Sequence, residues 1–338
     1  MKVFVTGGTG YIGSHTDVEL QQSSFEVVIV DNLCNSNIHV LDGIEKITGV
    51  RPEFEQFDLT DEKATRDFVA RHKDIKAVIH FAALKAVGES VSKPLEYYKN
   101  NLNSLMNVLS SMREFGVKNL VFSSSCTVYG QADVLPVTEQ TPRKQAESPY
   151  GNTKAMCEDI MRDLAHVEKE MNLIALRYFN PIGAHPSANI GELPNGIPNN
   201  LIPYLTQTVA GIREQLSVFG NDYNTSDGTP VRDYIDVVDL AKAHVVAIRR
   251  LLEGKNKANY EYFNIGTGNG VSVLELIQAF EKATGKKVNY KIVGRRAGDI
   301  EKVWADTTLA NTELGWKAQV PLVETLANTW RWQEKLGK

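Results

Sequence analysis

The feature that most restricts the fold of this sequence is a glycine-rich turn directly after a short apolar run. Residues 2–6 have the length and composition of a buried strand, and Gly7, Gly10 and Gly13 follow at once. A helical pattern then continues to Leu20. Glycines at this spacing let the backbone turn tightly and approach a pyrophosphate, which would lie at the positive end of the helix. The pattern predicts a strand, a turn and a helix that together bind a dinucleotide.

An acidic residue follows where such a unit needs one. The next apolar run, 26–30, is followed by Asp31, and a carboxylate at this place would hydrogen-bond the adenosine ribose. The same carboxylate would repel a 2′-phosphate, and neither Asn32 nor Leu33 provides a guanidinium to bind one. Because strand, turn, helix and acid occur in this order, we favour dinucleotide binding over a purely structural turn, and NAD over NADP.

Strands and helices continue to alternate through the first half of the chain. Strand-like runs occur at 53–57, 77–83, 119–122 and 173–178, and helical patterns at 61–72 and 94–115. This alternation predicts an α/β fold with a Rossmann-type doubly wound parallel sheet, in which ligands lie outside the carboxyl ends of the strands. Asp58, Phe81 and Lys85 should then line one crevice. His80 lies within an apolar run and is expected to be a packed core residue.

Two polar clusters are candidates for catalysis. Pro149 presets a first helical turn, and the four-residue spacing then places Tyr150 and Lys154 on one helical face. The ammonium is expected to bring the Tyr150 pKa, ordinarily ~10, towards working pH and so make a general base. In the serine run 123–125, Ser125 is our choice for a hydroxyl that binds a substrate oxygen beside the phenol. The alternatives are an ordinary helix surface, and hydroxyls that only satisfy backbone groups at a strand end.

Together these motifs resemble the extended short-chain dehydrogenase/reductase family. The runs 82–90, 180–183 and 198–201 are more narrowly similar to the UDP-glucose (UDP-galactose) 4-epimerases, and the resemblance extends from about residue 2 to residue 332. It implies an isomerase of galactose metabolism that interconverts UDP-glucose and UDP-galactose. In such an enzyme NAD takes a hydride from C4, leaving a 4-keto sugar, and returns it to the other face.

The resemblance also implies the residues that contact each ligand. The catalytic residues would be Tyr150, Lys154 and Ser125. Those matching NAD contacts are Gly7, Gly10, Tyr11, Ile12, Gly13, Asp31, Asn32, Leu33, Cys34, Asn35, Ser36, Asp58, Leu59, Phe81, Ala82, Ala83, Lys85, Asn100, Ser125, Tyr150, Lys154 and Phe179. Those matching UDP-sugar contacts are Ser125, Tyr150, Asn180, Asn200, Leu201, Val218, Phe219, Arg232, Arg296, Asp299 and Val303.

The second half of the chain predicts a second lobe. The 338 residues exceed the ~250–300 at which one core stops growing, and 181–199 is a Gly-, Pro- and Asn-rich stretch suited to a loop over a ligand. We assign 1–180 and about 233–265 to an NAD-binding Rossmann domain, whose sheet the strand 260–265 rejoins. About 181–232 and 266–338 form a smaller α/β lobe for the UDP-sugar. Arg232 and Arg296 suit bidentate pairing with its diphosphate, and a surface ion pair is the alternative for either.

Val303 departs from one form of the family pattern. The resemblance places it beside the sugar 2-substituent, where a Tyr restricts some members to plain hexoses. A Val at this position leaves room for an N-acetyl group, so we predict that UDP-GlcNAc and UDP-GalNAc are also interconverted.

Two other functions are weighed against the epimerase. A 4,6-dehydratase of the same superfamily would need an acid pair after the serines, where Cys126, Thr127 and Val128 stand. A noncatalytic NAD-responsive binding module is the second alternative, but it would not need the serine, tyrosine and lysine together. Both are disfavoured.

The composition argues against several partners. A net charge of -4 supplies no basic field for nucleic acid, and no apolar run approaches the ~20 residues that would span a bilayer. The N-terminal residues have no signal-peptide pattern. Cys34, Cys126 and Cys157 fit neither a disulfide framework nor a metal site, so we expect a cytoplasmic protein without a metal. The family resemblance implies a homodimer through the helices 94–115 and 150–170.

Overall fold

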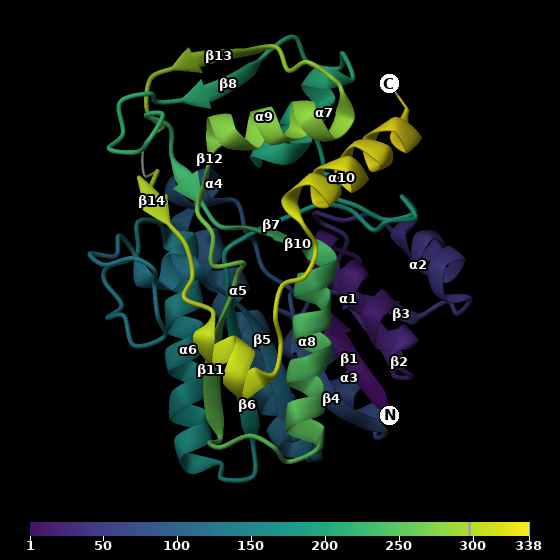
Figure 1. Ribbon diagram of the computed structural model, residues 1–338. Helices are drawn as coiled ribbons and strands as arrows, with labels where there is room; N and C mark the ends of the chain where they lie inside the picture. Colours follow the sequence, from purple (N-terminus) through teal and green to yellow (C-terminus); the bar gives the residue numbers. More distant parts are fainter. Residues whose placement is uncertain (297–298, 338) are drawn as a thin grey trace.

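A seven-stranded parallel sheet organises the first half of the chain (Figure 1). The computed structural model describes residues 1–296 and 299–337. The strands are β1 (Lys2–Thr6), β2 (Glu26–Asp31), β3 (Glu53–Gln56), β4 (Ile75–His80), β5 (Asn119–Ser125), β6 (Asn172–Tyr178) and β11 (Tyr260–Ile265), in the order β11-β6-β5-β4-β1-β2-β3. The order changes direction between β1 and β4, so a ligand crevice is expected outside their carboxyl ends.

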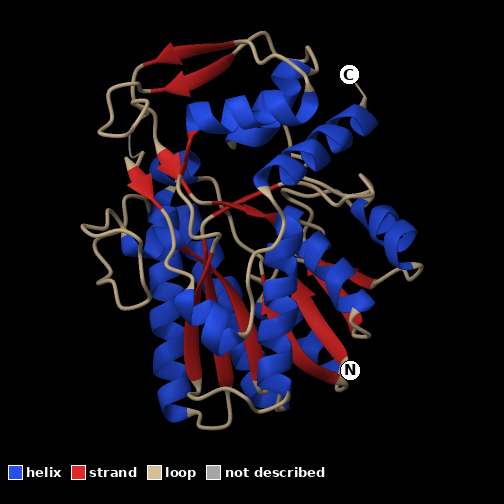
Figure 2. Ribbon diagram, viewed as in Figure 1, coloured by secondary structure: helices blue, strands red, loops and turns tan. Residues whose placement is uncertain are grey.

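Helices cover both faces of this sheet (Figure 2). One face packs against α1 (Tyr11–Gln22), α2 (Val40–Thr48) and α8 (Val237–Leu252), and the other against α3 (Glu62–Arg71), α5 (Pro94–Phe115) and α6 (Pro149–Val167). Alternate strand residues point to opposite faces, so Val3 and Val5 join the first core and Phe4 the second. The predicted Rossmann-type doubly wound sheet is confirmed, including the return of β11 to it.

A second lobe, at the top of Figure 1, has a core of its own. It is built from α7 (Leu201–Val209), β8 (Leu216–Phe219), α9 (Val273–Thr284), β13 (Tyr290–Val293) and α10 (Leu322–Leu336). Ser272 accepts a hydrogen bond from the Glu275 amide, and the Glu275 side chain accepts one from the Ser272 amide. This capping box fixes the start of α9.

Short strands lie between the sheet and the second lobe. β7 (Asn180–Ile182) pairs with β10 (Tyr234–Asp236), and β9 (Val231–Arg232) lies between β12 (Val271–Ser272) and β14 (Lys302–Val303). The remaining short elements are α4 (Val87–Ser92), the 3-10 turn η1 (Cys126–Tyr129) and the π-helical turn η2 (Ala310–Leu314). No helix within 1–296 and 299–337 is long and apolar enough to cross a membrane.

One segment of the predicted second lobe packs on the first. Ala310, Leu314 and Trp316 are buried in the core that α8 forms with the sheet. The Trp316 indole donates to the Asp239 carbonyl oxygen at 3.0 Å, which fixes the segment against α8. The segment 266–338 is therefore not all second lobe, as the sequence predicts, because this turn belongs to the first-lobe core. A turn this short has no periodicity to reveal which core buries it.

Candidate functional site

The glycine turn leaves no room for side chains at two of its positions. Gly7 has a φ of +68°, and a Cβ on it would lie 2.8 Å from the Ala82 nitrogen. A Cβ on Gly13 would lie 2.4 Å from the Gly7 carbonyl oxygen. Glycine is therefore required at both positions for the turn to close against β4 and α1.

The start of α1 fits a bound phosphate. Gly10 is the N-cap residue, and no side chain that the structure describes caps the helix there. The first-turn amides of Tyr11 and Ile12 are thus available to an anion, with the positive end of the helix dipole behind them. This end of the crevice fits the pyrophosphate of a dinucleotide.

The polar residues predicted for the adenosine side lie together beyond β2. Asp31 accepts hydrogen bonds from the Leu33 amide at 2.8 Å and the Ser36 hydroxyl at 3.1 Å. The Asn32 side-chain amide donates to Asp58 at 3.0 Å. Leu59 differs from the rest of the predicted set, because its side chain is buried in the core under α3 and α5.

The crevice also brings Lys85 and Asn200 together, although one was predicted for NAD and the other for the UDP-sugar. The Lys85 ammonium lies 3.8 Å from one carboxylate oxygen of Glu192, and the Asn200 amide donates to the same oxygen at 2.6 Å. Sequence reasoning missed Glu192. It lies in the Gly-, Pro- and Asn-rich stretch, where no local pattern distinguishes it.

Tyr150 and Lys154 lie on the first turns of α6. Ser148 caps this helix by accepting from the Gly151 amide at 3.2 Å, and Pro149 is its first residue. The buried Lys154 ammonium lies 5.9 Å from the centroid of the Tyr150 ring and donates to the Ser123 carbonyl oxygen at 2.6 Å. The helix therefore places both side chains at the carboxyl end of β5, as predicted.

The three serines at the end of β5 have different partners. The Tyr178 hydroxyl donates to the Ser123 hydroxyl, and the Ser124 hydroxyl donates to Glu158. Ser125 caps η1 by accepting from the Thr127 amide at 3.2 Å, and its hydroxyl acts to lower the pKa of the Tyr150 phenol. The structure thus brings Ser125 to the phenol, and Ser123 and Ser124 to other groups.

The two arginines predicted for the UDP-sugar have different surroundings. Arg232 on β9 is held by an ion pair with Asp299 and by the Val231 carbonyl oxygen at 2.8 Å. Arg296 is exposed and faces α4, where a Cβ on Gly88 would lie 3.4 Å from its guanidinium. The structure thus shows the ion-pair alternative for Arg232, and this pair holds the guanidinium in place on β9.

The apolar members of this set differ in exposure. Phe219 is 41% exposed, whereas the adjacent Val218 is buried in the second-lobe core, so its side chain does not reach a ligand. Val303 is only 4% exposed and packs in a cluster with Phe179 and Tyr129. It pairs with Arg232 in the β14–β9 ladder.

Known proteins share this arrangement over the whole chain. The family model described as GDP-mannose 4,6 dehydratase matches residues 4–329. The UDP-glucose 4-epimerase of Bacillus subtilis (strain 168) is 54% identical over 333 residues, covering 98% of this chain and 97% of that protein. The chain belongs to the UDP-glucose 4-epimerase family.

Two solved epimerase structures are similar in fold. The UDP-glucose 4-epimerase of Stenotrophomonas maltophila, with bound NAD and formylated UDP-arabinopyranose, has a TM-score of 0.95 at 50% identity. That of Bifidobacterium longum, in complex with NAD+ and UDP, has a TM-score of 0.95 at 46% identity. Each comparison covers 99% of this chain and 98% of the other.

The electrostatics of this epimerase differ from one prediction. Burial raises the pKa of Tyr150 to about 12, and the Cys126 thiol adds to the rise, while the hydrogen bond with Ser125 lowers it. Burial also lowers the pKa of Lys154 to about 8. We expected Lys154 to lower the Tyr150 pKa. In the protein without bound ligands this expectation is wrong, because the Tyr150 pKa is raised. The ammonium faces the Ser123 carbonyl and the Phe122 ring, and desolvation of the phenolate dominates.

His80 has the structural role that we expected. Its Nδ1 lies 2.9 Å from the Thr6 hydroxyl, and the ring is buried between strands of the sheet. Burial lowers its pKa to about 3, and the charge of Lys154 adds to this. The imidazole therefore stays neutral in the core of the epimerase.

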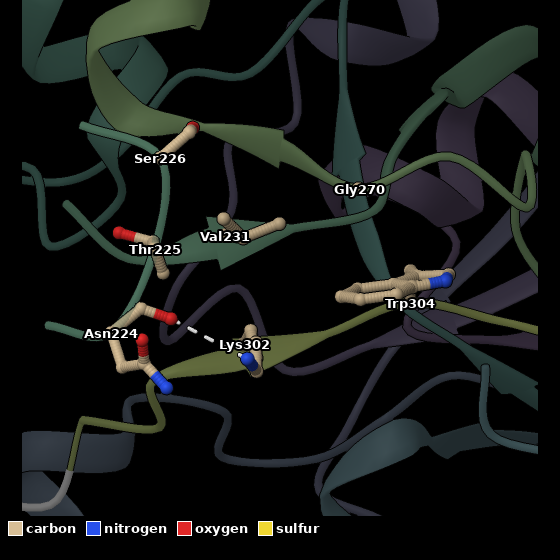
Figure 3. Close-up of a pocket in the computed structure, with 7 residues that line it drawn as sticks. All are labelled: Asn224, Thr225, Ser226, Val231, Gly270, Lys302 and Trp304. Atoms are coloured by element: carbon tan, nitrogen blue, oxygen red, sulfur yellow. Dashed lines mark hydrogen bonds between the residues drawn. The ribbon is translucent and has the colours of Figure 1, made fainter. Parts of the chain in front are cut away.

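A separate pocket of about 370 Å³ lies on the opposite side of the small sheet (Figure 3). It is lined by Asn224, Thr225, Ser226, Val231, Gly270, Lys302 and Trp304. Val231 and Lys302 are ladder partners that face it, so the next residues on both strands, Arg232 and Val303, face the other way. This pocket is therefore distinct from the candidate active site of the epimerase.

Proposed function

We propose that this protein is an NAD-dependent UDP-glucose 4-epimerase that interconverts UDP-glucose and UDP-galactose through a 4-keto intermediate. The observation that carries the proposal is the convergence of Ser125, Tyr150 and Lys154 at the carboxyl end of β5. This convergence lies beside a glycine turn that fits a dinucleotide. The full-length likeness to UDP-glucose 4-epimerases supports the same reaction.

The two parts of the chain would divide the binding. Residues 1–180 and about 233–265 would hold NAD, with the pyrophosphate at the start of α1 and Asp31 on the adenosine ribose. The segments 181–232 and 266–338, apart from the turn around η2, would hold the UDP-sugar. When bound, oxidised NAD supplies a two-electron acceptor and a positive charge next to the reacting carbon.

Tyr150 would remove the proton of the sugar 4-hydroxyl and later return it. With a pKa of about 12, the phenol needs a nearby positive charge to ionise at neutral pH. Lys154 lies within reach of the same space, and its pKa of about 8 leaves it mostly cationic at pH 7. Ser125 would hold the 4-oxygen and stabilise the phenolate by hydrogen bonding. The same three groups can serve both faces of the ketone if the sugar turns between the steps.

Affinity would then reside in the nucleotide and not in the sugar. Arg232, which the ion pair with Asp299 fixes in place, suits the diphosphate, and the exposed Arg296 would close on it from the same lobe. Asn200 and Phe219 would hold the rest of the nucleotide. A loosely held hexose can turn, whereas a tightly bound one could not.

We further propose that the epimerase accepts UDP-GlcNAc and UDP-GalNAc. Val303 lies on the β14 face shared with Arg232 and packs next to Phe179, which supports a place beside the sugar. A Val occupies less volume there than a Tyr would. Val303→Tyr should remove turnover of the acetylated pair selectively and keep that of the plain hexoses. Loss of both activities in a folded variant would contradict this role.

One experiment tests the proposed reaction directly. Purified full-length protein without added NAD is incubated with each of the four UDP-sugars, and the epimers are resolved by chromatography. Formation of UDP-galactose from UDP-glucose is expected. If none of the four UDP-sugars is converted, the incubation is repeated with added NAD. No conversion in that second incubation would refute the proposal. Tyr150→Phe separates the epimerase from a noncatalytic NAD-binding module, because turnover must collapse while bound NAD is retained.

The 4,6-dehydratase remains the less favoured enzyme. Its acid pair would follow the serines, where η1 places Cys126 and Thr127. Burial raises the Cys126 pKa to about 12, so this thiol is a poor proton donor. Release of water from the sugar would be detected by mass spectrometry of the products as a loss of 18 mass units.

We also propose a cytoplasmic homodimer. α5 and α6 pack side by side, and Met106 on α5 and Met156 on α6 are exposed apolar side chains. A second copy pairing through these helices would cover them. Cys34, Cys126 and Cys157 are free, which suits a reducing compartment. Gel filtration with light scattering should give twice the mass of the chain.

A further inference from the structure

A buried ion pair joins α6, which carries Tyr150, to β6. Glu158 on α6 and Arg177 on β6 are 2% and 4% exposed. The Arg177 Nε donates to the Glu158 Oε1 at 2.9 Å, and a second hydrogen bond joins the Nη2 to the Oε2. Desolvation offsets much of the attraction in such a pair, so stability alone is a weak explanation for it.

The ion pair holds both sides of the predicted catalytic serine. The hydroxyl of Ser124, the residue before Ser125, donates to the Glu158 Oε1 at 2.5 Å. The Arg177 Nη1 donates to the Tyr129 hydroxyl at 2.9 Å, and Tyr129 ends the η1 turn that starts directly after Ser125. The strand end and the turn that present Ser125 are thus fixed to one carboxylate and its guanidinium.

The same carboxylate belongs to the helix that carries the predicted base. Glu158 is one helical turn after Lys154 and two turns after Tyr150, a rise of about 12 Å along α6. Because residues four apart share a helical face, Lys154 and Glu158 both lie on the buried side of α6. The Ser124–Glu158 hydrogen bond is therefore a direct link between the element with Ser125 and the element with Tyr150.

We propose that Glu158 and Arg177 are positioning residues that hold the end of β5 and the start of η1, and with them the Ser125 hydroxyl, in place on the Tyr150 side of the site. The proposal rests on the proposed 4-epimerase function. Both side chains are almost fully buried, so they would act through Ser125 and not on the sugar. A misplacement of about 1 Å at a reacting centre lowers rates about a hundredfold, which gives such a link functional weight.

Ser124→Ala in the full-length protein is the mildest test. It removes the link but leaves the hydrogen bonds between Glu158 and Arg177 in place, so no buried charge loses its partner. We expect kcat for UDP-glucose to fall about tenfold while KM changes less than about twofold. The acid limb of the kcat–pH profile should move to higher pH, because the Ser125 hydrogen bond lowers the Tyr150 pKa. The titratable groups that surround Tyr150 are unchanged in the variant: Cys126 on η1, Lys154 on α6, Tyr178 on β6 and Tyr97 on α5.

Two controls separate positioning from a general loss of structure. Ser111→Ala removes an equally buried hydroxyl on α5, which donates to the Asn107 carbonyl oxygen at 2.9 Å, and should leave kcat and its pH profile unchanged. In a Ser125→Ala background, Ser124→Ala should lower kcat further by less than about twofold, because the group that it positions is gone. Thermal unfolding midpoints confirm that each variant is folded.

Several outcomes would overturn the proposal. One is a Ser124→Ala variant with the kcat of the wild type. Another is a Ser111→Ala variant that loses as much kcat as Ser124→Ala does. A third is a further tenfold loss of kcat when Ser124→Ala is added to Ser125→Ala. Wild-type protein that converts none of the four UDP-sugars would instead refute the proposed function, and this inference with it. Active wild-type protein together with an unaffected Ser124→Ala variant refutes the positioning role alone.

Discussion

Asp236→Asn should stabilise the folded protein, and by an amount that depends on pH. Asp236 caps α8 by accepting from the Val238 amide at 2.8 Å, and its other oxygen accepts from the Thr325 hydroxyl of α10 at 2.8 Å. This carboxylate joins the first-lobe helix to the C-terminal helix. Burial raises its pKa to about 6, although these hydrogen bonds oppose the rise.

The magnitude follows from the difference between the folded and unfolded pKa. Below the unfolded value of 3.8 the carboxyl is protonated in both states, and there is no penalty. Between pH 3.8 and about 6 the unfolded chain ionises first, so stability falls as pH rises. Above pH 6 the full loss of folding stability is reached. It amounts to about 3 kcal/mol, because each unit of difference between the folded and unfolded pKa corresponds to about 1.36 kcal/mol.

An Asn at this position cannot ionise but keeps the hydrogen bonds. Its oxygen can accept from the α8 amides, and its amide group can donate to the Thr325 hydroxyl. The variant should therefore equal the wild type in free energy of unfolding near pH 3.5 and exceed it by about 3 kcal/mol at pH 7.5.

Urea unfolding, followed by circular dichroism from pH 3.5 to 8, measures this difference. Burial also raises the pKa values of Asp17 and Asp233, but these groups titrate in both proteins, so the difference between variant and wild type isolates Asp236. Asp133→Asn, at a side chain that is 79% exposed, is the control and should change stability by less than about 0.5 kcal/mol at every pH. A difference that does not vary with pH, or an Asn variant less stable than wild type at pH 7.5, would refute the reasoning.

Three further substitutions test the site. Gly13→Ala places a Cβ 2.4 Å from the Gly7 carbonyl oxygen, so the purified variant should contain no NAD. Bound NAD is measured as the nucleotide released when the protein is denatured. Retained NAD would show that the turn is not the cofactor site. Ser125→Ala should lower kcat about 10²-fold or more. It should also move the acid limb of the kcat–pH profile to higher pH, because Ser125 lowers the Tyr150 pKa. An unshifted profile in steady-state assays would contradict that role. In Arg232→Lys, the lysine cannot form the bidentate pair that a guanidinium forms with a diphosphate. The variant should therefore have a KM for UDP-glucose about tenfold higher, with little change in kcat. An unchanged KM would exclude Arg232 from the diphosphate site.

Much of the framework is predictable because its signals are local. The helix 94–115 and the strand 260–265 have the predicted bounds, since apolar spacing and a proline at the helix start are read within one segment. Gly13 belongs to the same class, because a Cβ on it would meet the Gly7 carbonyl oxygen of the turn itself; the space at Gly7, in contrast, is closed by the distant Ala82. The predicted pair Tyr150 and Lys154 needed only the pitch of a helix.

The short helical elements α4, α7 and η2 were not predicted. α4 and α7 have too few residues to show a helical period, and the turn around η2 was placed with the wrong core. Each is held by contacts with distant parts of the chain. Tertiary packing, and not local propensity, decides such elements.

What the sequence determined by itself is the parallel α/β sheet, the NAD-type turn and the tyrosine–lysine pair, because each follows from spacing along the chain. Ser125 was the serine chosen from the sequence, but only the tertiary structure gives partners to the other two, because Ser124 hydrogen-bonds Glu158 and Ser123 hydrogen-bonds Tyr178. It also decided the direction of the Tyr150 pKa, which burial raises although a lysine lies one turn away. Burial and hydrogen-bond partners come from residues that only folding brings together, so spacing alone cannot supply them.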